Sequence, residues 1–512
     1  MTGFRLMLVL LLSAIFMQDA RCQNPSLADI NGHVQANRHE ILTEYFSFLS
    51  IPNNARDSVN IRKNAQFIQS MLQKRGVSAR LLEARTPGVP PAVYGEVNVP
   101  GAKETLAFYA HYDGQPVSAD KWNPKLKPTT PLLLSDALEK GGEVIPFPEK
   151  GAPFGPDWRI YCRSSSDDKA GVMAIILAYD AIIRTGKRPA FNIRFFFEGE
   201  EEIGSVHLDE ILEKHKSLLN ADLWVIADGP IHQSGRPMLD FGVRGDVNMS
   251  LTVYGPKRPL HSGHYGNWAP NPCLALAKLL AGMKDDQGRV TVKGYYDDVI
   301  PYTDAEKKAF AAMPSVEEQM KRELGIKRTE GDRTLADAYE WPTLNINGMK
   351  CADAGEKATN QITTEATASL DLRQVPGTDH RVQVERVKQH IRDQGYHLID
   401  RAPTDAERMQ HEKIARVSAV TGGYNAQRTP LDLPVSQRVI RAVQASTDKP
   451  IVVMPTSGGS LPLFIFEKIL AAKVITLCVA NHDNNQHSEN ENLRLQNLWD
   501  VTGQLAGIML MK

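Results

Sequence analysis

The 512-residue sequence predicts an α/β protein with a mixed, mostly parallel sheet, into which a smaller α+β domain is inserted. Two patterns predict this fold. Apolar, strand-like runs alternate with segments of helical periodicity over most of the chain, as in parallel sheets whose strands are joined by helices. Between about residues 247 and 410, strand-like runs instead alternate apolar and polar residues, which indicates strands exposed on one face. A chain of this length also exceeds what one hydrophobic core usually serves.

The first 22 residues are predicted to be a signal peptide. Arg5 precedes an apolar run that ends at Phe16 and is too short to span a bilayer, and small residues precede a cut ahead of Gln23. We therefore expect a secreted or periplasmic protein with no transmembrane segment in the mature chain. Lipoprotein anchoring at Cys22 is the less favoured alternative, because Asp19–Arg21 is a poor lead-in for it.

The larger unit is expected to comprise residues 23–246 and 411–512. Apolar runs predict strands at residues 105–114, 192–199, 221–229, 449–455 and 472–481. A loop from Arg163 leads into an apolar helix that Gly186 ends. Ser488 and Glu491 form a capping box, which predicts the start of a final amphipathic helix.

The inserted unit is expected at residues 247–410. Half-exposed strands are predicted at residues 247–255 and 366–377, and helices at residues 271–283 and 380–396. Asn271 is expected to cap the first of these helices, with Pro272 in its first turn.

Composition excludes several classes of partner and site. Lys plus Arg number 59 and Asp plus Glu 60, so neither nucleic acid nor an anionic membrane is expected as a partner. Cys162, Cys273, Cys351 and Cys478 contain no CxxC pair and predict neither a disulfide scaffold nor a Cys-type zinc site. One disulfide is left open, but scattered buried thiols are the favoured interpretation.

Metal-capable side chains follow the predicted strands and the loop before the apolar helix. They are His111, Asp113, Asp167, Asp168, Glu198, Glu200, Glu201, Glu202, Asp228 and His487. Open α/β sheets place their ligands at the carboxyl ends of the strands, so these groups should meet at one edge. Imidazole nitrogens and carboxylate oxygens suit a pair of divalent cations with a bridging carboxylate. A further carboxylate that binds no metal could act as general base.

The motifs HYD, SSSDDKAG, EGEEEIGS, VIADG, HSGHYGN and HSENE, in this order, resemble those of the M20 metallopeptidases. The similarity runs from about residue 40 to the C-terminus and is greatest to the dipeptidase and carnosinase-like branch. It implies a catalytic domain, an inserted lid and dimerisation domain, a homodimer, and two divalent metal ions per chain. Zinc is the expected metal, with manganese or cobalt as alternatives.

The resemblance also implies a role for each metal-capable residue. His111 and Asp228 would hold one metal, Glu202 and His487 the other, and Asp167 would bridge them. Asp113 would orient His111, and Glu201 would be the general base, which leaves Glu198 and Glu200 as accessory groups. Asp168 stands where the family tends to place a cis peptide, and capping of the following helix could be divided between Asp167 and Asp168.

Substrate-facing residues follow from the same resemblance. His261 of HSGHYGN would reach across a dimer interface and stabilise the oxyanion in the partner's site. Arg373, Gly459 and Ser460 would hold the substrate carboxylate, and Asn360 matches a polar lid position. His207, His232 and His264 are interpreted as ordinary surface histidines.

The function expected from these residues is that of a secreted dinuclear-metal hydrolase. It would cleave dipeptides or short peptides near a free carboxylate, as a dipeptidase or a carboxypeptidase. An N-acyl amino acid deacylase is the alternative. A catalytically inactive peptide-binding relative is a distant one, because all the metal ligands and the base are present.

Overall fold

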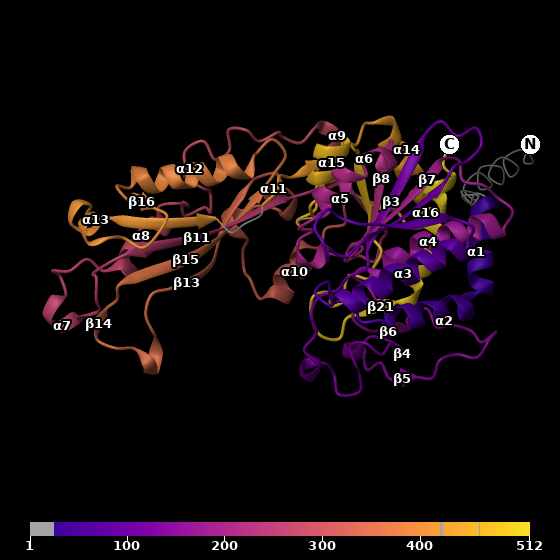
Figure 1. Cartoon of the computed structure of the whole chain (residues 1–512), viewed down its shortest axis with the longest axis horizontal. Coiled ribbons are helices and arrows are strands. Elements are labelled where there is room, and N and C mark those ends of the chain that lie inside the picture. Colours follow the sequence, from indigo (N-terminus) through magenta and orange to yellow (C-terminus); the bar gives the residue numbers. More distant parts are fainter. Residues whose placement is uncertain (1–24, 420–422, 460) are drawn as a thin grey trace, which may run out of the picture.

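The computed structural model describes residues 25–419, 423–459 and 461–512. The predicted signal peptide, Cys22 and Ser460 lie outside these residues. Figure 1 shows a large α/β unit and an inserted unit that extends to one side of it. Within the described ranges, no helix is both long enough and apolar enough to cross a membrane.

The main sheet has eight strands in the order β1-β2-β7-β3-β8-β20-β9-β19. Their bounds are β1 Ser78–Leu82, β2 Ala92–Val97, β3 Thr105–His111, β7 Asn192–Glu198, β8 Leu223–Ala227, β9 Met238–Asp240, β19 Val452–Met454 and β20 Val474–Leu477. The central strands β7, β3, β8 and β20 run parallel, as do β9 and β19. The pairs β1–β2, β2–β7 and β20–β9 are antiparallel. The expected α/β fold with a mixed, mostly parallel sheet is confirmed.

Helices pack on both faces of this sheet (Figure 1). One hydrophobic core includes side chains of α1 Pro25–Ala36, α2 Arg38–Leu49, α3 Ser58–Lys74, α4 Lys169–Arg184, α14 Pro434–Gln444 and α16 Leu495–Leu510. A second core joins the sheet to α5 Leu208–Lys214, α6 Lys216–Leu219 and α15 Phe464–Leu470.

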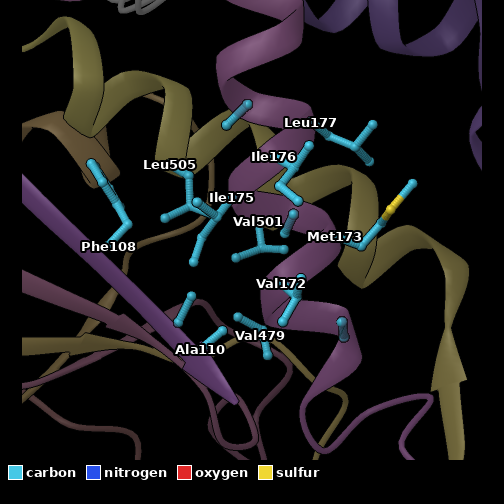
Figure 2. Close-up of a cluster of buried hydrophobic side chains, with 14 of the residues drawn as sticks. Phe108, Ala110, Val172, Met173, Ile175, Ile176, Leu177, Val479, Val501 and Leu505 are labelled. Atoms are coloured by element: carbon cyan, nitrogen blue, oxygen red, sulfur yellow. The ribbon is translucent and has the colours of Figure 1, made fainter. Parts of the chain in front are cut away.

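Figure 2 shows the packing that fixes the position of α4. Phe108 and Ala110 of β3, Ile175 of α4, and Val501 and Leu505 of α16 lie in one cluster, and none is more than 2% exposed. Because α4 lies between the sheet and α16, it is apolar on nearly all sides. Burying one large apolar side chain contributes about 1.5–3 kcal/mol, so the start of α4 is firmly positioned.

The inserted unit contains a five-stranded sheet in the order β13-β15-β11-β17-β16. Its elements are β11 Gly245–Tyr254, α8 Pro272–Ala281, β13 Thr343–Lys350, β15 Glu365–Gln374, α12 His380–Asp393, β16 His397–Ile399 and β17 Ile414–Ala419. Burial alternates along β11 and β15, as predicted, because α8 and α12 cover one face only. Asn271 caps α8 through the Cys273 and Leu274 N–H groups.

Shorter elements complete both units. In the inserted stretch of the sequence they are β12 Leu260–His261, α7 Ser262–Tyr265, α9 Asp304–Ala311, α10 Glu317–Leu324, α11 Leu335–Tyr339, β14 Gln361–Ile362 and α13 Asp405–Gln410. Of these, α9 packs against the main sheet. In the larger unit, β4 Leu132–Leu134, β5 Val144–Ile145, β6 Arg159–Tyr161 and β21 Asn492–Arg494 form a four-stranded sheet. A pair between β10 Gly242–Val243 and β18 Gln427–Arg428 lies where the chain enters and leaves the inserted unit.

Three sequence predictions need correction. Residue 410 is too early an end for the inserted unit, because β17 pairs with β11 as far as Ala419. Ser488 and Glu491 do not cap the final helix, since α16 begins at Leu495 after the short strand β21.

The third correction concerns the cysteines. Cys273 of α8 and Cys351, directly after β13, form a disulfide with a Cα–Cα distance of 5.6 Å. The two cysteines are 78 residues apart in the sequence, so no local pattern indicated this contact. Cys162 and Cys478 are free and buried, as expected.

Candidate metal centre

The two carboxylate oxygens of Asp167 face two different imidazoles. Asp167 Oδ1 lies 3.0 Å from His111 Nε2, and Asp167 Oδ2 lies 3.1 Å from His487 Nε2. Asp228 Oδ2 is 3.9 Å from His111 Nε2, and Glu202 Oε2 is 3.2 Å from His487 Nε2. Two groups, each of one histidine and two carboxylates, therefore share Asp167. The structure brings together all five residues for which the sequence predicted metal ligation.

The parallel strands explain this convergence. His111 ends β3, Asp228 follows β8, and Glu202 lies in a short 3₁₀ turn, Glu201–Ile203, after β7. Because β7, β3 and β8 are parallel neighbours, their carboxyl ends meet at one edge of the sheet. Asp167 reaches the same edge from the loop that precedes α4.

The loop before α4 is held by a buried carboxylate that sequence reasoning had assigned elsewhere. The backbone N–H groups of Ser164, Ser166 and Asp167 donate to Glu491 over 2.9–3.0 Å. Arg163 Nη1 also lies 2.7 Å from Glu491 Oε2. Carboxylates that accept several N–H bonds form strong, charge-assisted contacts. Glu491 therefore positions the bridging residue, a role that only the tertiary structure reveals.

Asp168 caps the following helix while Asp167 contacts the imidazoles, which is the division of roles that the sequence analysis allowed. Its side chain caps α4 by accepting the Gly171 N–H at 3.0 Å, so Asp167 remains available to the imidazoles. The Asp167–Asp168 peptide bond is cis, as the resemblance implied.

Asp113 is fully buried and contacts both the His111 imidazole and the turn after β7. Its Oδ1 lies 3.4 Å from His111 Nδ1, the contact expected of an orienting group. The same carboxylate accepts the backbone N–H groups of Glu201 at 3.1 Å and Glu202 at 3.0 Å. Asp113 thus positions the turn after β7 as well as the histidine.

Glu201 lies beside the two groups without belonging to either. Its Oε2 is 3.9 Å from His111 Nε2, and its side chain is 15% exposed. Burial raises the pKa of Glu201 well above its usual value; His111 acts against this, and Asp228 and Glu202 add to it. The carboxylate is therefore placed next to the site with an oxygen free to exchange a proton.

The chemistry of the donor set fits a pair of divalent cations. Hydrogen bonds to Asp167 and Glu202 raise the pKa of His487 to about 10, because two carboxylates face its imidazole. Asp167 Oδ2 is buried, and the His487 imidazole lies 3.1 Å from it. An imidazole nitrogen and two carboxylate oxygens in each group match the ligands that zinc takes, and manganese or cobalt also accept them.

A cavity of about 970 Å³ adjoins the centre. Asp167, Glu201, Asp228 and His487 line one part of it. The α9–α11 segment of the inserted unit supplies another wall, where Phe310, Met313 and Tyr339 pack against a buried cluster of the main sheet. A volume of this size suits a small-molecule or peptide substrate.

The comparisons with known proteins agree with this geometry. Residues 107–510 match the sequence profile of Peptidase family M20/M25/M40. The chain belongs to this family. It is 26% identical over 456 residues to the Cys-Gly metallodipeptidase DUG1 of Candida albicans, which covers 87% of this chain and 86% of the relative. It is 25% identical over 440 residues to the Beta-Ala-His dipeptidase of Homo sapiens, covering 84% and 79% of the two chains.

Among solved structures, the M20 family metallo-carboxypeptidase Sso-CP2 from Sulfolobus solfataricus superposes with a TM-score of 0.72. The two proteins share 27% identity, and the match covers 92% of this chain and 98% of the other. The resemblance to the M20 metallopeptidases is thereby confirmed, and with it the assignment to a family with dinuclear metal sites.

Of the remaining predicted residues of this M20 chain, those that the structure describes lie outside the metal centre of their own chain. His261 is exposed in β12, and Figure 1 places the neighbouring α7 and β14 at the far tip of the inserted unit. Asn360 lies beside it, because its carbonyl accepts the Ser262 N–H at 2.9 Å. Arg373 Nε lies 3.1 Å from Asp371 on β15, and Gly459 lines the cavity.

The accessory residues are placed as follows. Glu198 accepts a hydrogen bond of 2.7 Å from the Tyr109 hydroxyl, and Glu200 accepts the backbone N–H of His207. His264 is exposed, as expected. His232 is not a surface histidine: it is 3% exposed and lines the cavity. A hydrogen bond between the backbone of Ile231 and Ala480 draws this turn onto the main sheet.

Proposed function

We propose that this protein is a dinuclear metal-dependent dipeptidase that cleaves short peptides near a free carboxylate. The observation that carries the proposal is the pair of histidine–carboxylate groups that share Asp167, with Glu201 beside them and the cavity in front. The M20 relatives named above support the class of reaction, because two of them are dipeptidases.

The residues of the site have separate roles in the proposed reaction. His111 and Asp228 would hold one cation, Glu202 and His487 the other, and Asp167 would contact both. Two divalent cations bound there would polarise the scissile carbonyl and make water a better nucleophile near neutral pH.

Glu201 accepts the proton of the attacking water and returns it to the leaving amine, as a general base and then a general acid. Asp113 holds the Glu201 backbone in place for both transfers. We assign Arg373, Gly459 and Ser460 to the substrate carboxylate.

A metal-dependent dipeptidase should contain about two divalent ions per chain and lose activity when they are removed. We expect elemental analysis to find these ions, and dialysis against a chelator to abolish hydrolysis of a dipeptide panel until zinc, manganese or cobalt is restored. A matched panel of N-acetyl amino acids separates the deacylase alternative, which would be favoured if these were cleaved faster. Active protein without bound metal would contradict the proposal.

We further propose that the protein is exported, as a secreted or periplasmic enzyme. The Cys273–Cys351 disulfide supports this, because disulfides persist mainly in oxidising compartments. N-terminal sequencing of the protein recovered outside the cytoplasm should begin at Gln23, whereas an uncleaved N-terminus would oppose the proposal.

A further inference from the structure

A buried carboxylate with no assigned role lies in the wall of the substrate cavity. Asp240, at the end of β9, is 7% exposed and lines the same cavity as Glu201. Its Oδ1 is buried and has no hydrogen-bond partner among the described residues. Its Oδ2 has only a weak contact, 3.8 Å, with the thiol of Cys478. No lysine, arginine or histidine of the described ranges forms an ion pair with it.

The surroundings of Asp240 are apolar. Met238, Met454 and Cys478 form a buried cluster, against which Phe310 and Tyr339 pack. Burying an unpaired carboxylate in such a place costs free energy, which either a proton or a cation must offset. Burial accordingly raises the pKa of Asp240 to about 7.

The register of the sheet places Asp240 at a useful distance from the metal centre. The Asp228 N–H donates to the Leu477 carbonyl of β20, and Leu477 in turn pairs with Leu239 of β9. Since β20 lies between β8 and β9, two strand spacings, about 10 Å, separate β8 from β9, and Asp240 pairs with Thr476, one residue before Leu477 on β20. A long side chain of a substrate bound at the centre can span this distance.

We propose that Asp240 binds the cationic side chain of a substrate residue, so that the enzyme prefers peptides carrying lysine or arginine. The methylene groups of such a side chain pack along Met238, Met454 and Phe310, and its charged end forms a charge-assisted hydrogen bond with Asp240. This proposal rests on the proposed function, because it takes the cavity to hold the peptide substrate.

The test compares lysyl-glycine with norleucyl-glycine, whose side chain has similar length but no charge. We expect the metal-loaded wild type to favour lysyl-glycine by about 10- to 100-fold in kcat/KM, as a hydrogen bond to a charged group allows. Asp240→Asn, which keeps the shape and removes the charge, should lose most of this preference. It should leave norleucyl-glycine hydrolysis within about threefold of the wild-type value, since the apolar contacts remain. Asp432→Asn, at an exposed aspartate outside the cavity, is the matched control and should change neither rate.

Wild-type protein that treats the two dipeptides alike would overturn the proposal. So would an equal loss on both substrates in Asp240→Asn, because that result would point to the α-amino group common to both.

Calorimetric titration with L-lysine and L-norleucine tests the site without turnover, and tighter binding of lysine by wild type than by Asp240→Asn is expected. If no dipeptide is cleaved but this difference in binding is found, the proposed function fails while the cation site stands. Equal binding of the two amino acids by wild type overturns the cation site, whether or not Asp240→Asn folds.

Discussion

Glu201→Gln should bind both cations and lose about 10²–10⁴-fold in kcat, because the substitution removes a proton acceptor and no metal ligand. The glutamine keeps the size of the side chain, and its backbone N–H can still donate to Asp113. Steady-state kinetics together with elemental analysis of the same preparation would measure both effects.

Glu202→Gln and Glu200→Gln are the controls for this result. Glu202 lies 3.2 Å from His487 in one metal-binding group, so its substitution should weaken binding of one cation. Glu200 accepts hydrogen bonds from His207 and lies in neither group, so its substitution should leave kcat nearly unchanged. Activity of Glu201→Gln within about tenfold of wild type would show that another group takes the proton.

We propose that the protein is a homodimer in which His261 acts in the partner's site, and mixed dimers should reveal this. His261 is exposed at the tip of the inserted unit, away from the metal centre of its own chain. Homodimers of His261→Ala and of Glu201→Gln should each be nearly inactive, because the first lacks a donor to the developing oxyanion and the second lacks the base. Random exchange of subunits makes half of the dimers mixed, each with one complete site. About a quarter of the wild-type activity should then return.

His264→Ala serves as the control, since its exposed imidazole lies next to His261 and has no assigned role. Mixed with Glu201→Gln, it should show no gain beyond simple dilution of active subunits. If demonstrated exchange between His261→Ala and Glu201→Gln restores nothing, His261 either serves its own chain or takes no part in the reaction.

The residues of the metal centre could be predicted because strand order and ligand position are linked. His111, Glu202 and Asp228 each follow an apolar run, and parallel strands bring such positions to one edge. Sequence patterns alone indicated this edge, whereas the roles of the individual residues came from the motifs. His487 comes from a loop, and only its motif, HSENE, indicated it.

The residues that sequence reasoning misplaced or missed are those whose surroundings come from distant parts of the chain. Glu491 fits a capping-box pattern locally, but its partners at Ser164–Asp167 lie more than 300 residues earlier. His232 and Asp240 look like residues of a polar turn and a strand end. Both line the cavity to which the α9–α11 segment, from another part of the chain, contributes a wall. Local patterns carry no information on such contacts.

The Cys273–Cys351 disulfide stabilises the α9–α11 wall of the cavity independently of the metal ions. The two cysteines are separated by 78 positions in the sequence, and the segment between them includes α9, α10 and α11. Closing a loop of that length lowers the chain entropy of the unfolded state by the equivalent of about 4–5 kcal/mol. The bond lies in the inserted unit, whereas the cations would be held by side chains of the larger unit. A reductant would thus loosen the wall that the α9–α11 segment supplies to the cavity, and a chelator would act on the metal centre.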